Sequence, residues 1–338
     1  MESKPLVSIC CLVYNHEPYL RDCFEGFVKQ KTSFPIEILV HDDASTDHSA
    51  DIIREYTAKY PDLFKPIYQT ENQYSKGVKI SFEYQYPRAQ GKYIALCEGD
   101  DYWVDPNKLQ MQVDWLESHP DYTMCFHRSK IIKESEAHCS LKCDSIENRD
   151  YSATELFQEW IVPTASICIR KEVLAYPIKH PEKILNGDII LVEKAAHTGK
   201  VRGFKDTMAV YRVHANGITY DSTQKKERLK KYPGHYKCIK ENFPLIDRNI
   251  TKKTIYNSYI WLWGADKYHL KWQIKAFFTY PTYFFKDQFT QNTATSLQLI
   301  RQKHYKEAII SLPILKILIL FIYYNILKKN RIPAQGLK

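Results

Sequence analysis

The first half of the chain alternates short apolar runs with amphipathic stretches. Four short runs, residues 6–14, 36–43, 64–69 and 92–97, are predicted as strands, and the first is nearly continuous in apolar residues, as expected of a parallel strand covered on both faces. Between the first two runs, apolar residues recur every three or four positions, for example at Leu20, Phe24 and Phe27, which predicts a helix. This alternation favours an α/β protein with a doubly wound, mostly parallel sheet.

The pattern changes twice in the rest of the chain. Residues 129–160 are polar and irregular, which predicts a variable excursion, whereas 166–174 and 201–214 are patterned as returning strands. Beyond about residue 221 the chain is rich in lysines and aromatic residues with a helical pattern. We therefore expect a Rossmann-like domain over residues 1–220, in two parts (1–128 and 129–220), and a helical extension over 221–338.

Charge is distributed unevenly between these regions. The formal net charge is +9, and residues 221–338 alone hold 22 Lys and Arg against 7 Asp and Glu, so the preceding region is mildly acidic. A basic extension of this kind favours contact with an anionic surface. We expect a membrane surface and no nucleic acid, because the sequence shows no module for nucleic-acid recognition.

The most apolar segment of the extension is residues 311–329. Only eight consecutive residues, 317–324, are uninterrupted and apolar, which is well short of the roughly 20 that a span requires. Lysines and Arg331 follow, as expected beside anionic headgroups. Two arrangements stay open: attachment to the membrane surface, and packing of this segment on the body or on a second copy of the chain.

Cysteine usage and the N-terminal sequence bear on the compartment. The nine cysteines are scattered without a disulfide framework or a paired zinc-ligand spacing, which suggests reduced thiols. The N-terminal residues are typical of a first strand rather than a signal peptide. Together with the basic extension, these features predict a cytoplasmic protein that is peripheral on the inner face of the cell membrane.

Polar residues follow three of the predicted strands directly: Asn15 and Glu17 after the first, Asp42 and Asp43 after the second, and Glu98, Asp100 and Asp101 after the fourth. Each alone would be a turn or capping residue. Taken together they indicate a ligand site, because α/β sheets bind ligands beyond the carboxyl ends of their strands.

The cluster of carboxylates after the fourth strand indicates a cation. Ionised carboxylates repel one another at neutral pH, and oxygen ligands suit Mg²⁺ or Mn²⁺, which also bind substrate phosphates. The sequence has no glycine-rich phosphate-binding loop. Neutralisation of phosphate would then fall to the metal, and this combination points to a nucleotide-diphosphate substrate.

Three segments carry a resemblance to a known family. "VSICCLVYNHEPYL", "EILVHDDASTD" and "GKYIALCEGDDYWVDPNKLQMQV" resemble, in order and spacing, the family 2 glycosyltransferases with the GT-A fold. The resemblance covers roughly residues 5–220. The form "DDYW-x-DP-x-KL-x-x-Q" is similar to members that build bacterial surface polysaccharides, such as O-antigen, capsule or exopolysaccharide.

The resemblance implies roles for residues at the strand ends. Residues that would contact the nucleotide sugar are Val13, Asn15 and Glu17 at the base and ribose, Asp42 or Asp43 at the base, and Glu98 and Asp101 in the acidic element. Asp100 would be the main metal ligand. The first acidic position holds Glu98 where the family has Asp.

The resemblance also implies residues for the acceptor side. Asp188, in "NGDIILVEKAAHTGK", matches the acidic residue that accepts the proton of the acceptor hydroxyl, and its local alternative is a helix cap. In "YRVH", His214 would contact metal or diphosphate, and Arg212 would pair with a carboxylate of the body. Trp103 would either cover the sugar or lie in the core.

The resemblance implies an inverting transferase that moves a sugar from a nucleotide-diphosphate sugar to a hydroxyl of a glycan or lipid-linked acceptor. The metal would stabilise the departing diphosphate. An alternative is a non-catalytic relative that binds nucleotide or glycan for a partner, because Glu98 departs from the family's first acidic position.

Overall fold

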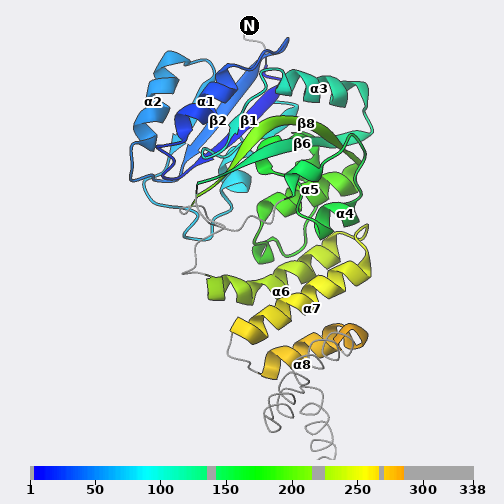
Figure 1. The fold of residues 1–338 in the computed structure, drawn as a ribbon. Helices are drawn as coiled ribbons and strands as arrows, with labels where there is room; N and C mark the ends of the chain where they lie inside the picture. Colours follow the sequence, from blue (N-terminus) through cyan, green and yellow to red (C-terminus); the bar gives the residue numbers. More distant parts are fainter. Residues whose placement is uncertain (1–3, 135–141, 215–224, 266–269, 285–338) are drawn as a thin grey trace, which may run out of the picture. The chain divides into compact units, whose positions relative to one another are not determined.

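The computed structural model describes residues 4–134, 142–214, 225–265 and 270–284. Its strands are β1 (Val7–Val13), β2 (Ile36–Asp42), β3 (Phe64–Tyr68), β4 (Tyr93–Leu96), β5 (Tyr102–Trp103), β6 (Tyr122–Lys133), β7 (Cys168–Arg170) and β8 (Lys200–Val213). They form one eight-stranded sheet in the order β3-β2-β1-β4-β7-β6-β8-β5 (Figure 1). The four strands from β3 to β4 are parallel, β6 and β8 are parallel, and β7 and β5 run antiparallel to their neighbours.

Helices cover both faces of this sheet. The helices of the first part are α1 (Leu20–Val28), α2 (Ser49–Lys59) and α3 (Lys108–Ser118), and those of the second are α4 (Ala153–Gln158), α5 (Gly187–Thr198) and α6 (Lys225–Asn242). Side chains of β1 alternate between the faces: Ile9 packs in the cluster that contains α1, α2 and α3, and Cys10 packs in the cluster that contains α4 and α5. Burial on both faces explains why β1 is apolar at nearly every position.

Strand β6 and helix α4 lie where we expected an irregular excursion over residues 129–160. The polar residues of β6 hid its pattern, because some of them are buried: His127 is fully buried with Nδ1 2.8 Å from the carbonyl oxygen of Arg128, and Ser129 is 3 % exposed. The β6–β8 pairing is also irregular near these residues. Tertiary packing therefore buries polar side chains here that the sequence pattern places at the surface.

Contacts divide the chain into two units, Met1–Ile250 and Thr251–Lys338. We expected the first domain to end at residue 220, whereas the first unit also holds α6. Cys238, Ile239 and Phe243 of this region are buried in one cluster with Ile184 and Ile190. Helix α6 is therefore attached to the sheet domain through an apolar core.

The second unit contains most of α7 (Arg248–Ala265) and α8 (Leu270–Thr279). Its described part is held by aromatic contacts, such as Tyr256 against Tyr283 with ring centroids 5.0 Å apart. Within the described residues, no helix has the length and apolar character needed to cross a membrane. Residues 311–329, the most apolar segment of the sequence, lie outside the described residues.

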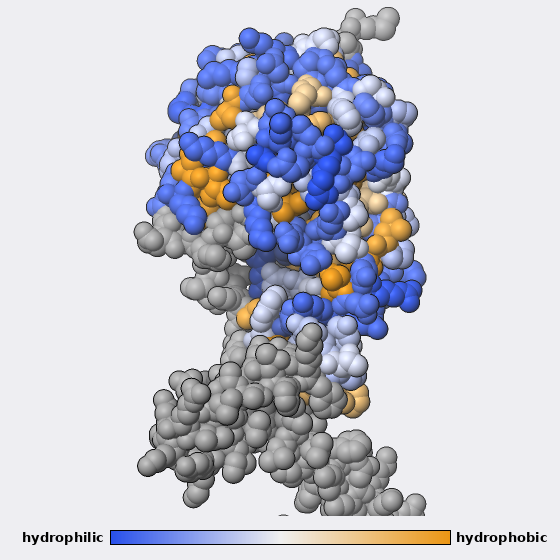
Figure 2. Space-filling model, turned by 45° about the vertical axis from the view of Figure 1, so that its right-hand side comes forward, coloured by the Kyte–Doolittle hydropathy of each residue, from blue (hydrophilic) through white to orange (hydrophobic). Residues whose placement is uncertain are grey.

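The face of the first unit drawn in Figure 2 is mainly hydrophilic and carries only small, separate apolar patches. The eight cysteines that the structure describes are all buried, and Cys139 lies outside the described residues. The described thiols therefore belong to the interior.

Candidate active site

The three strand ends with polar residues meet at one edge of the sheet. In the parallel register Val13 lies beside Asp42, and the amide of Asp43 donates to the carbonyl of Val13 at 2.9 Å. The loop after β4 continues along β1, where the amide of Gly99 donates to the carbonyl of Leu12 at 2.9 Å. The expectation that these segments share an edge is confirmed.

Asn15 and Glu17 tie the loop after β1 to the loop after β2. Asn15 has a left-handed backbone with φ 56°, and its Oδ1 accepts a hydrogen bond of 2.7 Å from the amide of Thr46. The Oε2 of Glu17 accepts from the amide of His48 at 3.1 Å, and the amide of Glu17 donates to Asp47 at 3.0 Å. These bonds give both residues a structural role in shaping the edge.

The two aspartates after β2 differ in their surroundings. Both carboxylate oxygens of Asp43 accept backbone hydrogen bonds, from Gln73 at 2.7 Å and Tyr74 at 3.0 Å. Asp42 accepts from the amide of Ser45 at 3.2 Å, and burial raises the pKa of its carboxyl. Both oxygens of Asp43 are therefore engaged by backbone amides of the segment that follows β3.

The acidic residues after β4 form a compact cluster. Oxygens of Glu98, Asp100 and Asp101 lie within 4.8 Å of one another. Asp100 Oδ2 is 3.0 Å from His214 Nε2, and Asp101 Oδ1 accepts from the amide of Arg212 at 2.9 Å. Asp101 Oδ2 is buried and has no hydrogen-bond partner among the described residues.

These carboxyls have different pKa values for physical reasons. Burial, with the charges of Asp100 and Asp188, raises the pKa of Glu98 to about 8. Burial and the charge of Asp100 also raise the pKa of Asp101. Burial acts in the same direction on Asp100, but the hydrogen bond from His214 and the charge of His16 bring its pKa below the usual value. Asp100 is therefore the carboxylate of the cluster that is held in its ionised form.

The backbone around the cluster is shaped by Gly99 and Arg212. A Cβ atom on Gly99 would lie 2.8 Å from His16 Nδ1 and 3.1 Å from Val13 Cγ2, so a larger residue here would force the loop or the His16 side chain to shift. The guanidinium of Arg212 donates to the carbonyl of Asp100 at 2.9 Å and pairs with Asp22. Arg212 is thus a structural brace, as its predicted pairing with a body carboxylate implied.

Trp103 lies in the core beneath the cluster. It is 3 % exposed, its Nε1 donates to the carbonyl of Ala165 at 2.8 Å, and the buried ammonium of Lys108 lies 4.0 Å from its ring centroid. Of the two predicted roles for this residue, the geometry supports the core.

Asp188 lies in the first turn of α5 and is partly buried. Its Oδ1 accepts from the amide of Ile189 at 2.9 Å. Burial raises the pKa of Asp188, while this hydrogen bond and the charge of Arg228 oppose the rise. Because the charge of Asp188 also raises the pKa of Glu98, α5 brings Asp188 within electrostatic range of the acidic cluster.

Sequence reasoning missed several residues around Asp188. Phe82 lies beside Gly187, with its Cε2 3.4 Å from where a Cβ would be, and Arg228 Nη2 donates to Asn186 Oδ1 at 3.2 Å. The strongly basic sequence at the start of α6 could have pointed to these residues, but we assigned its charge to contact with a membrane surface. Only the fold shows that this helix lies beside α5.

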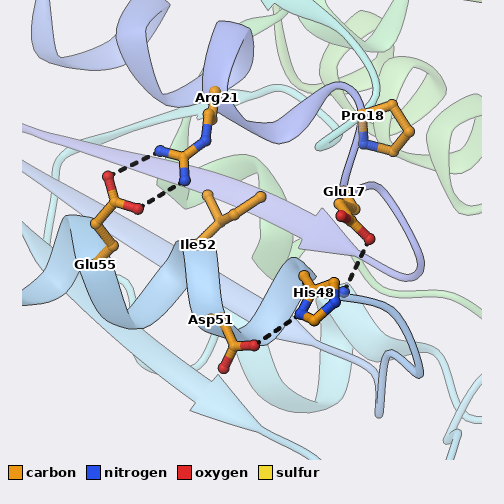
Figure 3. Close-up of a pocket in the computed structure, with 7 residues that line it drawn as sticks. All are labelled: Glu17, Pro18, Arg21, His48, Asp51, Ile52 and Glu55. Carbon is orange, nitrogen blue, oxygen red and sulfur yellow. Dashed lines mark hydrogen bonds and ion pairs between the residues drawn. The ribbon is translucent and has the colours of Figure 1, made fainter.

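A separate shallow pocket of about 470 Å³ lies between α1 and α2 and is lined by Glu17, Pro18, Arg21, His48, Asp51, Ile52 and Glu55 (Figure 3). Of the predicted site residues it contains only Glu17, whose carboxylate accepts from the amide of His48. Arg21 and Glu55 close one end with a bidentate ion pair at 2.8 and 2.7 Å. The pocket therefore lies apart from the acidic cluster, and we do not assign the sugar donor to it.

The comparisons with known proteins define the class of this fold and site. Residues 8–170 match the sequence model described as Glycosyl transferase family 2, and this region belongs to that family. Among solved structures, Staphylococcus aureus TarS in complex with UDP-GlcNAc is similar with a TM-score of 0.56 and 16 % identity, covering 91 % of this chain and 81 % of that one. A mannosyltransferase from Pyrobaculum calidifontis, in complex with GDP-Man and Mn²⁺, gives a TM-score of 0.50 and 15 % identity, covering 93 % and 87 %. The chain has the GT-A fold, as the resemblance implied.

Proteins related by sequence share more identical residues with this chain than the solved structures do, but their names say less about ligands. An uncharacterized protein of Mycobacterium tuberculosis is 39 % identical over 68 % of this chain, and the match spans 65 % of the relative's own length. The putative teichuronic acid biosynthesis glycosyltransferase TuaG of Bacillus subtilis is 33 % identical over 33 % of this chain and 42 % of its own length. The chain therefore spans less than two thirds of the length of either relative.

Proposed function

We propose that this chain is an inverting glycosyltransferase that moves a sugar from a nucleotide-diphosphate sugar to a hydroxyl acceptor in the synthesis of a bacterial surface polysaccharide. The observation that carries the proposal is the convergence of the acidic cluster of Glu98, Asp100 and Asp101 with Asp188. The acidic cluster suits a metal and a diphosphate, and Asp188 suits proton transfer from the acceptor. TarS was solved with UDP-GlcNAc, and TuaG is named as a putative glycosyltransferase of teichuronic acid biosynthesis, which supports this assignment.

The chemistry is a single displacement. The acceptor oxygen forms a bond to the anomeric carbon while the bond from that carbon to the diphosphate breaks, and the electron pair leaves with the nucleotide diphosphate. Asp188 accepts the proton of the acceptor hydroxyl. Burial raises the pKa of Asp188, which makes its carboxylate a stronger base for this task.

The residues present fit a divalent cation. Asp100 and Asp101 offer oxygen ligands, Asp101 Oδ2 is buried without a partner among the described residues, and His214 reaches Asp100. Such a set suits Mg²⁺ or Mn²⁺. Bound there, the cation would neutralise the charge of the leaving diphosphate. Glu98 carries a pKa of about 8 without a cation, so a bound cation favours its ionised form.

The test combines two variants with a panel of nucleotide sugars. Asp100→Asn should abolish Mn²⁺-dependent donor binding, measured by thermal shift, and Asp188→Asn should preserve binding but reduce transfer by roughly 100-fold or more. Asp51→Asn, on the exposed face of α2, is the matched control. Unchanged transfer by Asp100→Asn would contradict the proposal.

The same experiment addresses the alternative of a non-catalytic relative. If the wild-type chain binds nucleotide sugar but neither transfers nor hydrolyses it with a broad acceptor pool, and Asp188→Asn behaves identically, the chain is a binding module. The departure at Glu98 motivates this alternative, because a side chain longer by one methylene changes the reach of the first carboxylate.

We also propose that the C-terminal region attaches the enzyme to the inner face of the cell membrane, where a lipid-linked acceptor would lie. One exposed stripe of α8 mixes Ile274 and Phe278, which are 41 % and 76 % exposed, with Lys271 and Lys275. This is the pattern of helices that lie at a bilayer surface. Flotation with vesicles that contain anionic lipid should bring wild-type protein to the top fraction, and Phe278→Ser should weaken this. Equal recovery with neutral vesicles would contradict the proposed electrostatic attraction between the lysines and anionic lipid.

A further inference from the structure

Three cations, Lys79, Arg228 and Lys231, lie on two segments that contact the start of α5, where Phe82 approaches Gly187 and Arg228 contacts Asn186. Lys79 precedes the π-helical turn Ser81–Gln85, and Arg228 and Lys231 lie in the first turns of α6. Among the residues that the structure describes, no carboxylate forms an ion pair with any of the three cations. By contrast, the ammonium of Lys230, which lies between Arg228 and Lys231 in the sequence, pairs with Glu227 at 2.5 Å.

The cations are held by well-defined contacts. Arg228 Nη2 donates to Asn186 Oδ1 at 3.2 Å, immediately before α5. Behind Lys79, the fully buried amide of Gln85 donates to the carbonyls of Cys11 and Leu39 at 2.9 and 2.8 Å, which fixes this segment beneath β1 and β2. Segments distant in the sequence therefore converge around the start of α5.

The electrostatics of this cluster are those of an anion site. Burial lowers the pKa of Lys79, and the charges of Arg228 and Lys231 lower it further. Burial and the charges of Lys79 and Arg228 likewise lower the pKa of His235, to about 4. His235 is fully buried, and its Nε2 has no hydrogen-bond partner among the described residues. Like charges that are held together without a counter-ion are relieved when an anion binds.

The position of Lys79, Arg228 and Lys231 indicates which substrate carries this anion. The charge of Arg228 acts on Asp188, the candidate base. Arg228 contacts Asn186, two residues before Asp188. The carboxylates of the acidic cluster instead contact the end of β8, through His214 at Asp100 and the amide of Arg212 at Asp101. The donor diphosphate would lie at the acidic cluster, so an anion beside Arg228 belongs to the acceptor.

We propose that Lys79, Arg228 and Lys231 form a phosphate-binding site for the acceptor, so that the enzyme glycosylates a molecule that carries a phosphate or diphosphate group. The inference rests on the proposed glycosyltransferase function. The guanidinium of Arg228 suits bidentate contact with phosphate oxygens, and the two ammonium groups add point charges. The site would place the acceptor hydroxyl at Asp188 by fixing the phosphate nearby.

Binding is tested by calorimetry with the full chain, at low ionic strength and in excess EDTA, which removes metal-mediated binding at the acidic cluster. The probes are inorganic pyrophosphate, farnesyl diphosphate and glucose 1-phosphate. Arg228→Gln and Lys79→Gln should each weaken binding of the preferred probe roughly tenfold or more, because each removes a charge-assisted contact. Lys230→Gln, whose ammonium already has a carboxylate partner, should bind as the wild type does.

The probes also distinguish the source of the phosphate. Tighter binding of farnesyl diphosphate than of pyrophosphate supports a lipid-linked acceptor, and a preference for glucose 1-phosphate supports a sugar phosphate. Equal binding by wild type, Arg228→Gln and Lys79→Gln would overturn the inference. Because Lys79 and Arg228 belong to different elements, a folding defect in one variant, detected by circular dichroism, leaves the other as the test.

A parallel assay separates this inference from the proposed function. Release of nucleotide diphosphate from the donor panel with Mn²⁺ is measured on the same proteins. Donor turnover without variant-sensitive probe binding overturns the phosphate site alone. Probe binding that the variants weaken, in a wild type that neither binds nor turns over any donor, supports the anion site and overturns the glycosyltransferase function.

Discussion

Glu193 in α5 is a buried acid that should make the stability of this protein depend on pH. Its side chain is fully buried, and neither carboxylate oxygen has a hydrogen-bond partner among the described residues. The nearest titratable group is His197, with Nδ1 3.7 Å from Glu193 Oε2. His197 is neutral here, because its Nε2 accepts from the amide of Leu245 at 3.0 Å and its Nδ1 lies 2.8 Å from the backbone carbonyl of Glu193.

Burial without a cationic partner raises the pKa of Glu193 to about 9, whereas a glutamate in an unfolded chain titrates near ~4.3. Between these two values the folded protein holds a proton that the unfolded chain has lost. The contribution of Glu193 to stability is therefore fully present below the unfolded pKa and is lost as the pH rises to the folded pKa, by about 1.4 kcal/mol per pH unit between the two values. From pH 7.0 to 8.5 this group alone should remove about 2 kcal/mol.

Urea unfolding of the wild type and of Glu193→Gln at pH 7.0 and 8.5 measures this contribution. The amide keeps the shape of the protonated acid but does not titrate, so the variant should lose about 2 kcal/mol less than the wild type across the interval. Most histidine titration lies below this interval, and the remaining groups are common to both proteins. An identical change in the two proteins would refute the reasoning, because it would mean that Glu193 is ionised in the folded state.

Three further predictions follow from the site. Gly99→Ala should reduce Mn²⁺-dependent donor turnover by roughly tenfold or more while the thermal midpoint changes little, because the added Cβ displaces the loop from His16; full activity would contradict the close approach. Gln85→Met should lower the free energy of urea unfolding by roughly 2–4 kcal/mol, because the carbonyls of Cys11 and Leu39 lose their donor; a loss under about 0.5 kcal/mol would contradict this. Removal of divalent cations with EDTA should abolish donor turnover, and Mn²⁺ should restore it; turnover that persists in EDTA would show that the acidic cluster acts without metal.

The parallel part of the fold was predictable from the sequence. Strands β1, β2, β3 and β4 are each within two residues of their expected bounds at both ends. Burial on both faces explains the apolar runs of β1, β2 and β4, whereas β3 has one buried residue, Phe64. The position of the acidic cluster followed from the same reasoning, since carboxyl ends of parallel strands share an edge. Strand β6 escaped this reasoning because several of its polar residues are buried.

The second half of the candidate site required the fold. Asp188 was expected from the resemblance, but its local sequence also fits a helix cap. Lys79 and Arg228 carry no sequence pattern that separates them from surface lysines and arginines. Their proposed role rests on their lack of carboxylate partners in the described part of the chain and on their position beside α5.

The sequence by itself determined the alternation of strands and helices, the family, and the carboxylates at the strand ends, because these depend on periodicity and on short local motifs. Only the tertiary structure decided that both carboxylate oxygens of Asp43 accept backbone hydrogen bonds, that Trp103 is in the core, and that α6 brings Arg228 to Asn186 at the start of α5. The physical reason is that hydrogen-bond partners, burial and charge neighbours are set by residues far apart in the chain.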